Sequence, residues 1–222
     1  MSLDRRVNIC FHGIGAPARE LEPGENPYWI STALFEQILD YVKPKVNVHL
    51  SFDDGNASDA EIALSSLAAR GMRASFFPVA ARIGQLGSID RSGLRALIEK
   101  GMTVGSHGMH HRSWRGLDTA GLDEELSQAR ELIADAAGVP VSTAACPLGA
   151  YDRGVLRRLR FHGYAQVFTS DRTIARTKAW LQPRYSVRAT DRIEDVQAMV
   201  EQPRPLSVRA TSAARLAVKR LR

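Results

Sequence analysis

Residues 46–55 have the sequence Val46-Asn47-Val48-His49-Leu50-Ser51-Phe52-Asp53-Asp54-Gly55. Every second residue from Val46 to Phe52 is apolar and the residues between them are polar, which is typical of a strand with two different faces. Two adjacent carboxylates follow directly. They are costly at the end of an apolar strand unless a cation or a proton lies between them. The run therefore predicts a strand that carries a charged site at its carboxyl end.

Strand-like and helix-like segments alternate along the chain on both sides of this run. Besides the strand at 46–52, strands are predicted over residues 7–12, 73–79, 103–106, 141–146, 165–169 and 181–187. Helices are predicted over residues 31–42, 58–70, 92–100, 120–137 and 152–162, and from residue 191 onward. Ser31 is expected to cap the first helix, and Ser58 with Glu61 to form a capping box at the second. Such alternation requires parallel strand pairing through helical crossovers.

Two architectures satisfy this alternation, a (β/α) barrel and an open doubly wound sheet. Candidate reactive residues follow several predicted strands: His12, Asp53, His107, Pro147 and Asp171. Only a closed barrel brings so many carboxyl ends around one mouth, whereas an open sheet gathers its ligand groups near one switch point. The sequence therefore predicts an α/β fold, a small, distorted seven-stranded (β/α) barrel. The polar face of strand 46–52 would then point inward and place His49 beneath Asp53, as a possible partner of that carboxylate or as an ordinary interior histidine.

Length and charge predict one domain with a basic tail. The chain has 222 residues and a formal net charge of +6. Residues 204–222 hold 6 of the 30 basic residues and none of the 24 acidic ones, so the body over residues 1–203 is neutral at 24 against 24. A neutral body argues against a surface that binds nucleic acid. The tail predicts either a solvated terminus or a weak contact with an anionic membrane or another polyanion.

The compartment is predicted from what the sequence lacks. The longest nearly apolar run covers residues 74–81, whereas a membrane-spanning helix needs about 18 apolar residues. The first residues do not form the apolar core of a signal peptide. Cys10 and Cys146, far apart in the sequence, suit a reducing interior and are predicted to form no disulfide. We therefore expect a cytoplasmic protein whose basic tail would allow it to associate with a membrane.

A histidine cluster supplies the second half of the charged site. Residues 105–111, Gly105-Ser106-His107-Gly108-Met109-His110-His111, hold three of the six histidines of the chain. His107 can face one metal ion together with His111 or with His110, so the spacing leaves the second ligand open. One carboxylate and two imidazoles suit Zn²⁺, Co²⁺, Fe²⁺ or Ni²⁺ better than Mg²⁺ or Ca²⁺. The two motifs together predict a divalent transition-metal site, most simply zinc, with open positions for water and substrate.

These motifs resemble those of the polysaccharide deacetylases that share the NodB homology domain, carbohydrate esterase family 4. The first family motif, Thr/Ser-Phe-Asp-Asp-Gly, resembles residues 51–55, and the second, His-x-x-x-His, resembles residues 107–111. The third, Arg-x-Pro-Tyr/Phe-Gly, corresponds to Ala145-Cys146-Pro147-Leu148-Gly149. The resemblance spans roughly residues 7–200 and implies the same barrel.

The resemblance also implies roles for individual residues. It implies that Asp54, His107 and His111 bind the metal ion and that Asp53 is the general base. The backbone N–H at Leu148 would stabilise the oxyanion of the reaction. A metal ion that activates water beside a free carboxylate is consistent with this division of roles.

The chain departs from the family pattern at two positions. Ala145 replaces the arginine that orients the base, and residues 181–185 lack the late Leu-x-His motif whose histidine protonates the product amine. In a barrel the end of the first strand lies near the seventh, so His12 is predicted to be the general acid and Arg184 to orient Asp53. Branches of the family that resemble poly-N-acetylglucosamine deacetylases carry a similar early histidine before glycine and a similar Pro-Arg pair.

The predicted function is a metal-dependent N-deacetylase for N-acetylated sugars of a polysaccharide, an oligosaccharide or a lipid-linked glycan precursor. Trp29 and Trp114 are candidates for stacking on sugar rings or for ordinary loop packing, and Asp171 for contact with substrate or with an arginine. Two alternatives remain open. One is a metal-dependent amidohydrolase for a small non-sugar amide, and the other is a carbohydrate-binding barrel without catalytic activity. The sugar, the linkage, the physiological metal and the oligomeric state stay open.

Overall fold

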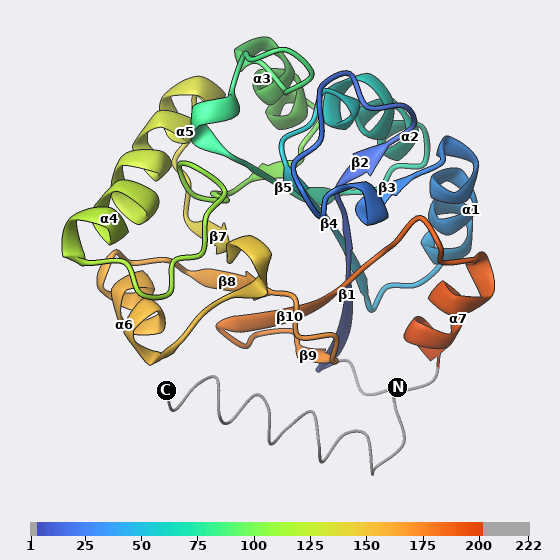
Figure 1. Ribbon diagram of the computed structural model, residues 1–222. Coiled ribbons are helices and arrows are strands. Elements are labelled where there is room, and N and C mark those ends of the chain that lie inside the picture. The colour runs from blue at the N-terminus through green and yellow to red at the C-terminus, as the bar shows by residue number, and fades with distance from the viewer. Residues whose placement is uncertain (1–3, 202–222) are drawn as a thin grey trace.

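A barrel of parallel strands forms the centre of the molecule (Figure 1), as the alternation of segments predicts. The computed structural model describes residues 4–201. Within this range seven parallel strands follow one another in the spatial order β6-β5-β4-β1-β10-β8-β7. Their bounds are β1 Arg5–Phe11, β4 Val48–Asp54, β5 Ala74–Pro78, β6 Thr103–Val104, β7 Thr143–Ala145, β8 Gln166–Thr169 and β10 Leu181–Ser186.

The barrel is distorted where β6 meets β7. A single parallel bridge, Ser106 with Ala144, joins the two edges. The N–H of Ser106 donates to the carbonyl of Thr143 at 2.9 Å, and the N–H of Ala145 donates to the carbonyl of Ser106 at 2.9 Å. Both bonds lie near the carboxyl ends of the strands. The barrel is therefore closed at its mouth, which is the end where the candidate site residues lie.

Helices surround the barrel, and their bounds are close to those predicted. They are α1 Thr32–Val42, α2 Leu64–Ala69, α3 Arg91–Glu99, α4 Thr119–Asp123, α5 Ala129–Ala137, α6 Arg153–Phe161 and α7 Ile193–Glu201. A π-helical segment, Glu124–Gln128, joins α4 to α5, so the long helix predicted over 120–137 is continuous but not regular. Ser31 caps α1 as expected, because its Oγ accepts a hydrogen bond from the N–H of Leu34 at 3.2 Å.

The capping box predicted at Ser58 is wrong. The hydroxyl of Ser58 makes no cap at the π-helical turn Asp59–Ala63 that precedes α2. It accepts a hydrogen bond from the N–H of Ile14 at 3.2 Å instead. A long-range contact thus uses the oxygen that would have capped the helix.

Three short strands were not predicted. β2 (Gly13–Ile14) pairs with β3 (Trp29–Ile30) in parallel, and β9 (Ala175–Arg176) pairs antiparallel with β1. At Gly13 a Cβ would lie 2.1 Å from the ring of Trp29, so only glycine permits this approach. The β2–β3 pair holds the two ends of the segment 15–28 together.

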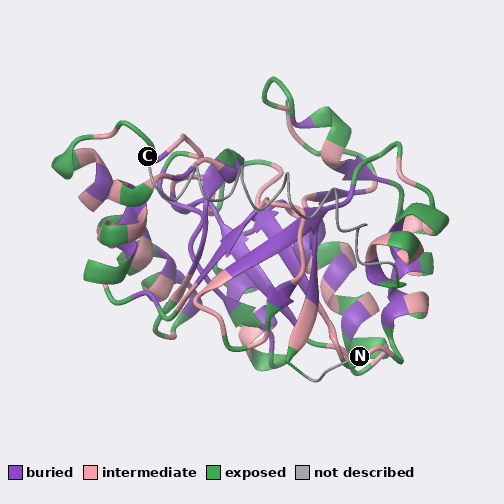
Figure 2. Ribbon diagram, turned by 90° about the horizontal axis from the view of Figure 1, so that it is seen from below, coloured by how far each residue is buried: buried purple, intermediate pink, exposed green. Residues whose placement is uncertain are grey.

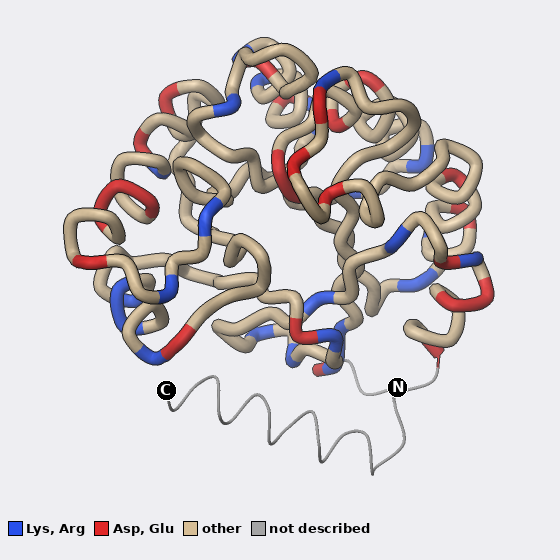
Figure 3. Tube along the Cα trace, viewed as in Figure 1, with Lys and Arg blue, Asp and Glu red and all other residues tan. Residues whose placement is uncertain are grey.

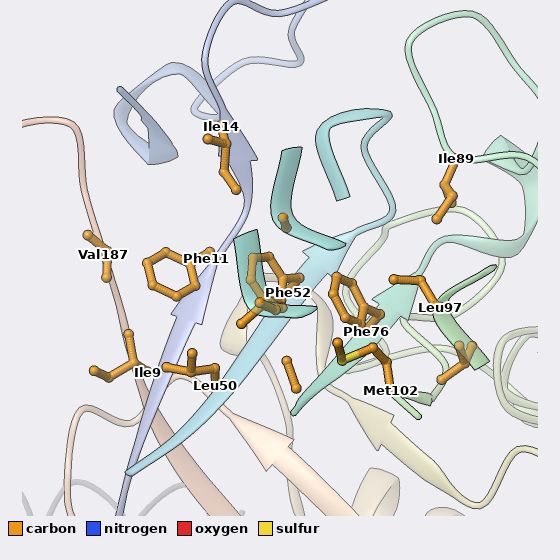
Figure 4. Close-up of a cluster of buried hydrophobic side chains, with 14 of the residues drawn as sticks. Ile9, Phe11, Ile14, Leu50, Phe52, Phe76, Ile89, Leu97, Met102 and Val187 are labelled. Atoms are coloured by element: carbon orange, nitrogen blue, oxygen red, sulfur yellow. The ribbon is translucent and has the colours of Figure 1, made fainter. Parts of the chain in front are cut away.

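The main hydrophobic core lies between the barrel and the helices, which Figure 2 shows as buried strands inside helices with exposed outer faces. The rings of Phe11, Phe52 and Phe76, on neighbouring strands, lie side by side (Figure 4). Their centroids are 5.1 Å apart for Phe11 with Phe52 and 4.5 Å for Phe52 with Phe76. This confirms that the apolar side of β4 packs on the helices, although Val46, at 93% exposed, lies before the strand.

His49 lies inside the barrel, and among the described residues its side chain contacts Ser75 and Phe168 and not Asp53. Its Nε2 is 3.1 Å from the hydroxyl of Ser75, and its ring stacks on Phe168 at 5.6 Å. Burial, followed by the charges of Arg6 and Arg184, lowers its pKa from 6.5 to about 3. His49 is therefore a neutral interior histidine, and Asp53 has a different partner.

This pKa of His49 predicts how stability depends on pH. The folded protein keeps His49 neutral down to about pH 3, whereas the unfolded chain binds a proton below about pH 6.5. Above pH 6.5 His49 is neutral in both states and does not affect the free energy of unfolding. As the pH falls below 6.5, proton binding by the unfolded chain lowers this free energy. Between about pH 6.5 and 4.5 we expect wild type to lose roughly 1–2 kcal/mol more unfolding free energy than His49→Gln, measured by denaturant titration.

A matched control is His110→Gln, which removes a half-exposed histidine. Its unfolding free energy should follow that of wild type across the same pH range. Equal pH slopes for His49→Gln and wild type would contradict the assignment of a low pKa to His49.

The charge and membrane predictions are tested only in part. Lys and Arg alternate with Asp and Glu around the ring of helices (Figure 3). Among the described residues no helix has the length and apolarity that crossing a membrane requires. The domain boundary at residue 203 and the basic tail lie outside the described residues, so the contact of the tail with anionic membranes stays a prediction, as does the cytoplasmic location.

Candidate metal and catalytic site

Two carboxylates and two histidines meet at the mouth of the barrel. Asp53 and Asp54 are the last two residues of β4, and the side chain of Asp53 lies on the inner face of the barrel. Asp54 has φ of 75°, a left-handed conformation that turns its carboxylate toward the mouth as well. Gly55 follows at φ of 71°, where a Cβ would lie 2.7 Å from Pro78. Nε2 of His107 and Nε2 of His111 lie 3.5 Å and 3.3 Å from Oδ1 of Asp54.

The hydrogen bonds of the two histidines orient them as metal ligands. Nδ1 of His107 lies 2.9 Å from the carbonyl of Ala145, and Nδ1 of His111 lies 2.9 Å from a carboxylate oxygen of Glu22. Both acceptors lack a proton, so each Nδ1 donates and each Nε2 keeps its lone pair. Burial, opposed by the charges of Asp53 and Asp54, lowers the pKa of His107 to about 4, which keeps the ring neutral.

The donor set fits a divalent transition metal. Both carboxylate oxygens of Asp54 are buried and have no hydrogen-bond partner among residues 4–201. One ligand atom each from Asp54, His107 and His111 lies within 4.8 Å of the others. An oxygen with two imidazole nitrogens is the combination that zinc and its neighbours prefer. The spacing left His110 open as a ligand, but the structure turns it outward to Glu124, with 3.1 Å between Nε2 and Oε1.

Asp53 forms a buried ion pair with Arg184. The two guanidinium nitrogens NH1 and NH2 each donate to one oxygen of Asp53 at 2.6 Å, and NH1 also lies 3.2 Å from the hydroxyl of Ser51. Arg184 is fully buried. Burial alone would raise the pKa of Asp53, but the charge and hydrogen bonds of Arg184 and the charges of His107 and His12 together outweigh it and hold this pKa well below its usual range. Asp53 is therefore ionised. Arg184 on β10 occupies the role of the motif arginine that Ala145 replaces in this chain.

His12 lies at the end of β1 and lines the same cavity. One of its ring nitrogens is within 4.8 Å of a carboxylate oxygen of Asp53. Its ring packs on Tyr28 with 4.8 Å between centroids, and the guanidinium of Arg188 lies 5.5 Å from the centroid of Tyr28. The buried Nδ1 of His12 has no hydrogen-bond partner in the described part of the chain. His12 is thus held beside Asp53 at the wall of the cavity, with a ring nitrogen that is unpaired among residues 4–201.

A cavity of about 300 Å³ opens over these groups. Leu148 lines it, with φ of 56° and a side chain that is 69% exposed. Several lining residues had no signal in the sequence. They are Glu22, Pro23, Gly24, Glu25, Tyr28 and Ser186, whereas Cys146 lies in the third motif and Ser170 follows the predicted strand 165–169. Most belong to the irregular segment 15–28, whose position over the barrel no local pattern encodes. Cys146 and Cys10 are both buried and unbridged.

Three residues predicted to contact substrate do not line the cavity. Trp29 and Trp114, candidates for sugar stacking or for loop packing, have exposed fractions of only 8% and 0%, which favours packing. Trp29 packs on Gly13, and Nε1 of Trp114 donates to Glu125 at 3.3 Å. Asp171 lies beside the cavity residue Ser170, and its carboxylate accepts the hydroxyls of Tyr151 at 2.8 Å and Thr169 at 2.6 Å.

Comparison with known proteins places the chain in a family. Residues 40–167, more than half of the chain, match the family model described as polysaccharide deacetylase, and the chain belongs to this family. A relative from Bacillus subtilis (strain 168), YxkH, is assigned to the polysaccharide deacetylases. It is 23% identical over 124 residues, which are 56% of this chain and 44% of that protein. The chain thus spans less than half the length of this relative.

Solved structures show the same fold. One polysaccharide deacetylase, BA0330 from Bacillus anthracis, has a TM-score of 0.77 at 19% identity, covering 89% of this chain and 69% of that one. The deacetylase PplD of Streptococcus pyogenes, in complex with acetate, has a TM-score of 0.77 at 16% identity, covering 89% and 98%. IcaB from Ammonifex degensii has a TM-score of 0.68 at 20% identity, covering 83% and 92%. These likenesses support the seven-stranded barrel.

Proposed function

We propose that the chain is a metal-dependent N-deacetylase that removes acetyl groups from an N-acetylated sugar. Its substrate would be a residue of a polysaccharide, an oligosaccharide or a lipid-linked glycan precursor. One observation carries the proposal: an ionised carboxylate, Asp53, is fixed by Arg184 beside the separate donor set of Asp54, His107 and His111. Membership in the polysaccharide deacetylase family supports the choice of substrate class.

A metal ion held by Asp54, His107 and His111, most simply zinc, with cobalt, iron or nickel as alternatives, would supply a Lewis acid that activates water and polarises a carbonyl group. The remaining steps belong to side chains of this protein. Asp53 would accept the proton of the attacking water as the C–O bond forms. Because Arg184 holds both oxygens of Asp53, the base stays ionised and fixed in direction.

The second half of the reaction needs a hydrogen-bond donor for the oxyanion and an acid for the leaving amine. The backbone N–H of Leu148 at the cavity wall would donate to the oxyanion. His12 would donate a proton to the amine nitrogen as the C–N bond breaks, which gives acetate and a free amino sugar. The stacking of His12 on Tyr28 supports this role, because it holds the imidazole at the cavity next to Asp53.

Acetate release from an N-acetylated chito-oligosaccharide or from poly-N-acetylglucosamine, measured together with the metal content, tests the proposed function. Metal-dependent release of acetate supports it. Bound metal without acetate from any sugar would favour an amidohydrolase for another amide. Protein that binds no metal would favour a carbohydrate-binding barrel.

His12→Ala tests the acid. We expect the rate of acetate release to fall by about 10²–10⁴-fold, the usual contribution of a general acid, while the metal content stays that of wild type. His110→Ala, which removes a histidine that points away from the cavity, is the control and should keep the wild-type rate. Acetate release by His12→Ala at the wild-type rate would refute the assignment.

A further inference from the structure

The segment 15–28, which we name the mouth loop, forms one wall of the cavity. It connects β2 to β3 and contributes Glu22, Pro23, Gly24, Glu25 and Tyr28 to the lining. It lies outside residues 40–167, which match the family model. The three motifs of the sequence, at residues 51–55, 107–111 and 145–149, also lie outside this loop.

Buried charges fix the mouth loop to the barrel. Glu25 is only 6% exposed and accepts hydrogen bonds from Arg19 through both of its oxygens. Arg19 also donates to Oδ1 of Asn56, in the turn that follows Asp54, at 2.9 Å. Arg82 lies 3.6 Å from Glu25 and also pairs with Glu22. The loop is thus anchored to the turn that follows Asp54 on β4 and to the turn Ala80–Arg82 that follows β5.

Glu22 connects this anchored loop directly to the donor set. One of its oxygens lies 2.9 Å from Nδ1 of His111, and the other pairs with Arg82. An oxygen of Glu22 that accepts the Nδ1 proton leaves the lone pair of His111 on Nε2, the nitrogen that lies 3.3 Å from Asp54.

We propose that Glu22 is a positioning residue for His111 and that docking of the mouth loop is thermodynamically coupled to metal binding. This inference rests on the metal site of the proposed function. The backbone of His111 has φ of 52° on an irregular turn. Without Glu22 its ring would lose the contact that selects its tautomer and direction. Carboxylates that orient metal-binding histidines in this way typically contribute 10–100-fold in affinity.

The coupling is reciprocal. If docking of the mouth loop strengthens metal binding by a given factor, metal binding stabilises the docked loop by the same factor. A role of Glu22 in folding alone would not produce this symmetry. The two effects can be measured separately on the full chain, and neither measurement requires turnover of a substrate.

The first experiment measures the zinc Kd by competition with a chromophoric chelator. We expect Glu22→Ala to weaken zinc binding about 10–100-fold and Glu22→Gln, which keeps an acceptor oxygen but loses the charge, to weaken it about tenfold. The matched control is Glu20→Gln, which removes an exposed carboxylate of the same loop and should bind zinc as wild type does. Circular dichroism checks that each variant is folded.

The second experiment follows hydrogen exchange of residues 16–25 with and without zinc. In wild type and in Glu20→Gln, zinc should slow this exchange, whereas in Glu22→Ala the effect of zinc should shrink by the factor lost in affinity. Zinc affinities of both Glu22 variants within twofold of Glu20→Gln would overturn the inference. A shift in zinc affinity in protein that releases no acetate would uphold it while refuting the proposed function, and wild type that binds none of zinc, cobalt, iron and nickel would overturn both.

Discussion

Asp53→Asn is expected to reduce acetate release by about 10²–10⁴-fold while zinc still binds. The substitution keeps the shape of the side chain but removes the group that would accept the proton of the attacking water. The proposed metal ligands are separate residues, so the loss should appear in the rate at saturating zinc and not in the zinc content. Initial rates of acetate release together with metal analysis of the same samples measure both quantities.

Asp171→Asn is the matched control for this prediction. It makes the same chemical change in a carboxylate that holds two neighbouring hydroxyls and does not line the cavity. We expect it to keep most of the wild-type rate. A rate for Asp53→Asn within threefold of wild type would exclude Asp53 as the base.

Arg184→Met should lower the free energy of unfolding by about 3–5 kcal/mol. Methionine fills much of the same volume but leaves the carboxylate of Asp53 buried, ionised and without its bidentate partner. Removal of one member of a buried pair costs more than the pair itself contributes, because the remaining charge has lost its solvation and gained nothing. Denaturant unfolding of metal-free protein measures this loss without interference from zinc.

Two further variants separate the charge from the geometry. The double variant Asp53→Asn/Arg184→Met removes both charges and should recover a large part of the stability that Arg184→Met loses. Arg184→Lys keeps the charge but cannot hold both oxygens of Asp53, so it should retain more stability than Arg184→Met yet release acetate more slowly than wild type. A loss below about 1 kcal/mol for Arg184→Met would show that Asp53 becomes protonated or finds another partner.

The seven barrel strands could be predicted because each of them is a short apolar or alternating run between helix-like segments. The predicted strand 46–52 corresponds to β4, Val48–Asp54, a shift of two residues at each end. By contrast, β2, β3 and β9 have two residues each and, unlike the equally short β6, do not alternate with helices along the chain. Ser58 and Glu61 have the spacing of a capping box, but the hydroxyl of Ser58 accepts a hydrogen bond from the distant N–H of Ile14 instead.

The site divides in the same way. The two aspartates and the histidines could be identified because each motif follows a strand, and strand ends converge in a barrel. Glu22 and Tyr28 could not be identified, because their position depends on ion pairs between segments that are distant in the sequence. The burial of Trp29 and Trp114 could not be predicted for a related reason. Whether an aromatic residue in a loop faces solvent depends on its tertiary neighbours, here Gly13 and Glu125.

Ala145 takes part both in the contact that closes the barrel between β6 and β7 and in the candidate metal site. The peptide group of Ala145 donates its N–H to Ser106 across the β6–β7 seam, and its carbonyl accepts the Nδ1 proton of His107. Opening of the barrel between β6 and β7 would thus also release the ring of His107, since Ser106 and His107 are adjacent in the chain. Closure of the barrel and the correct orientation of this proposed ligand are consequently one cooperative property, which hydrogen exchange at the amide of Ala145 would report.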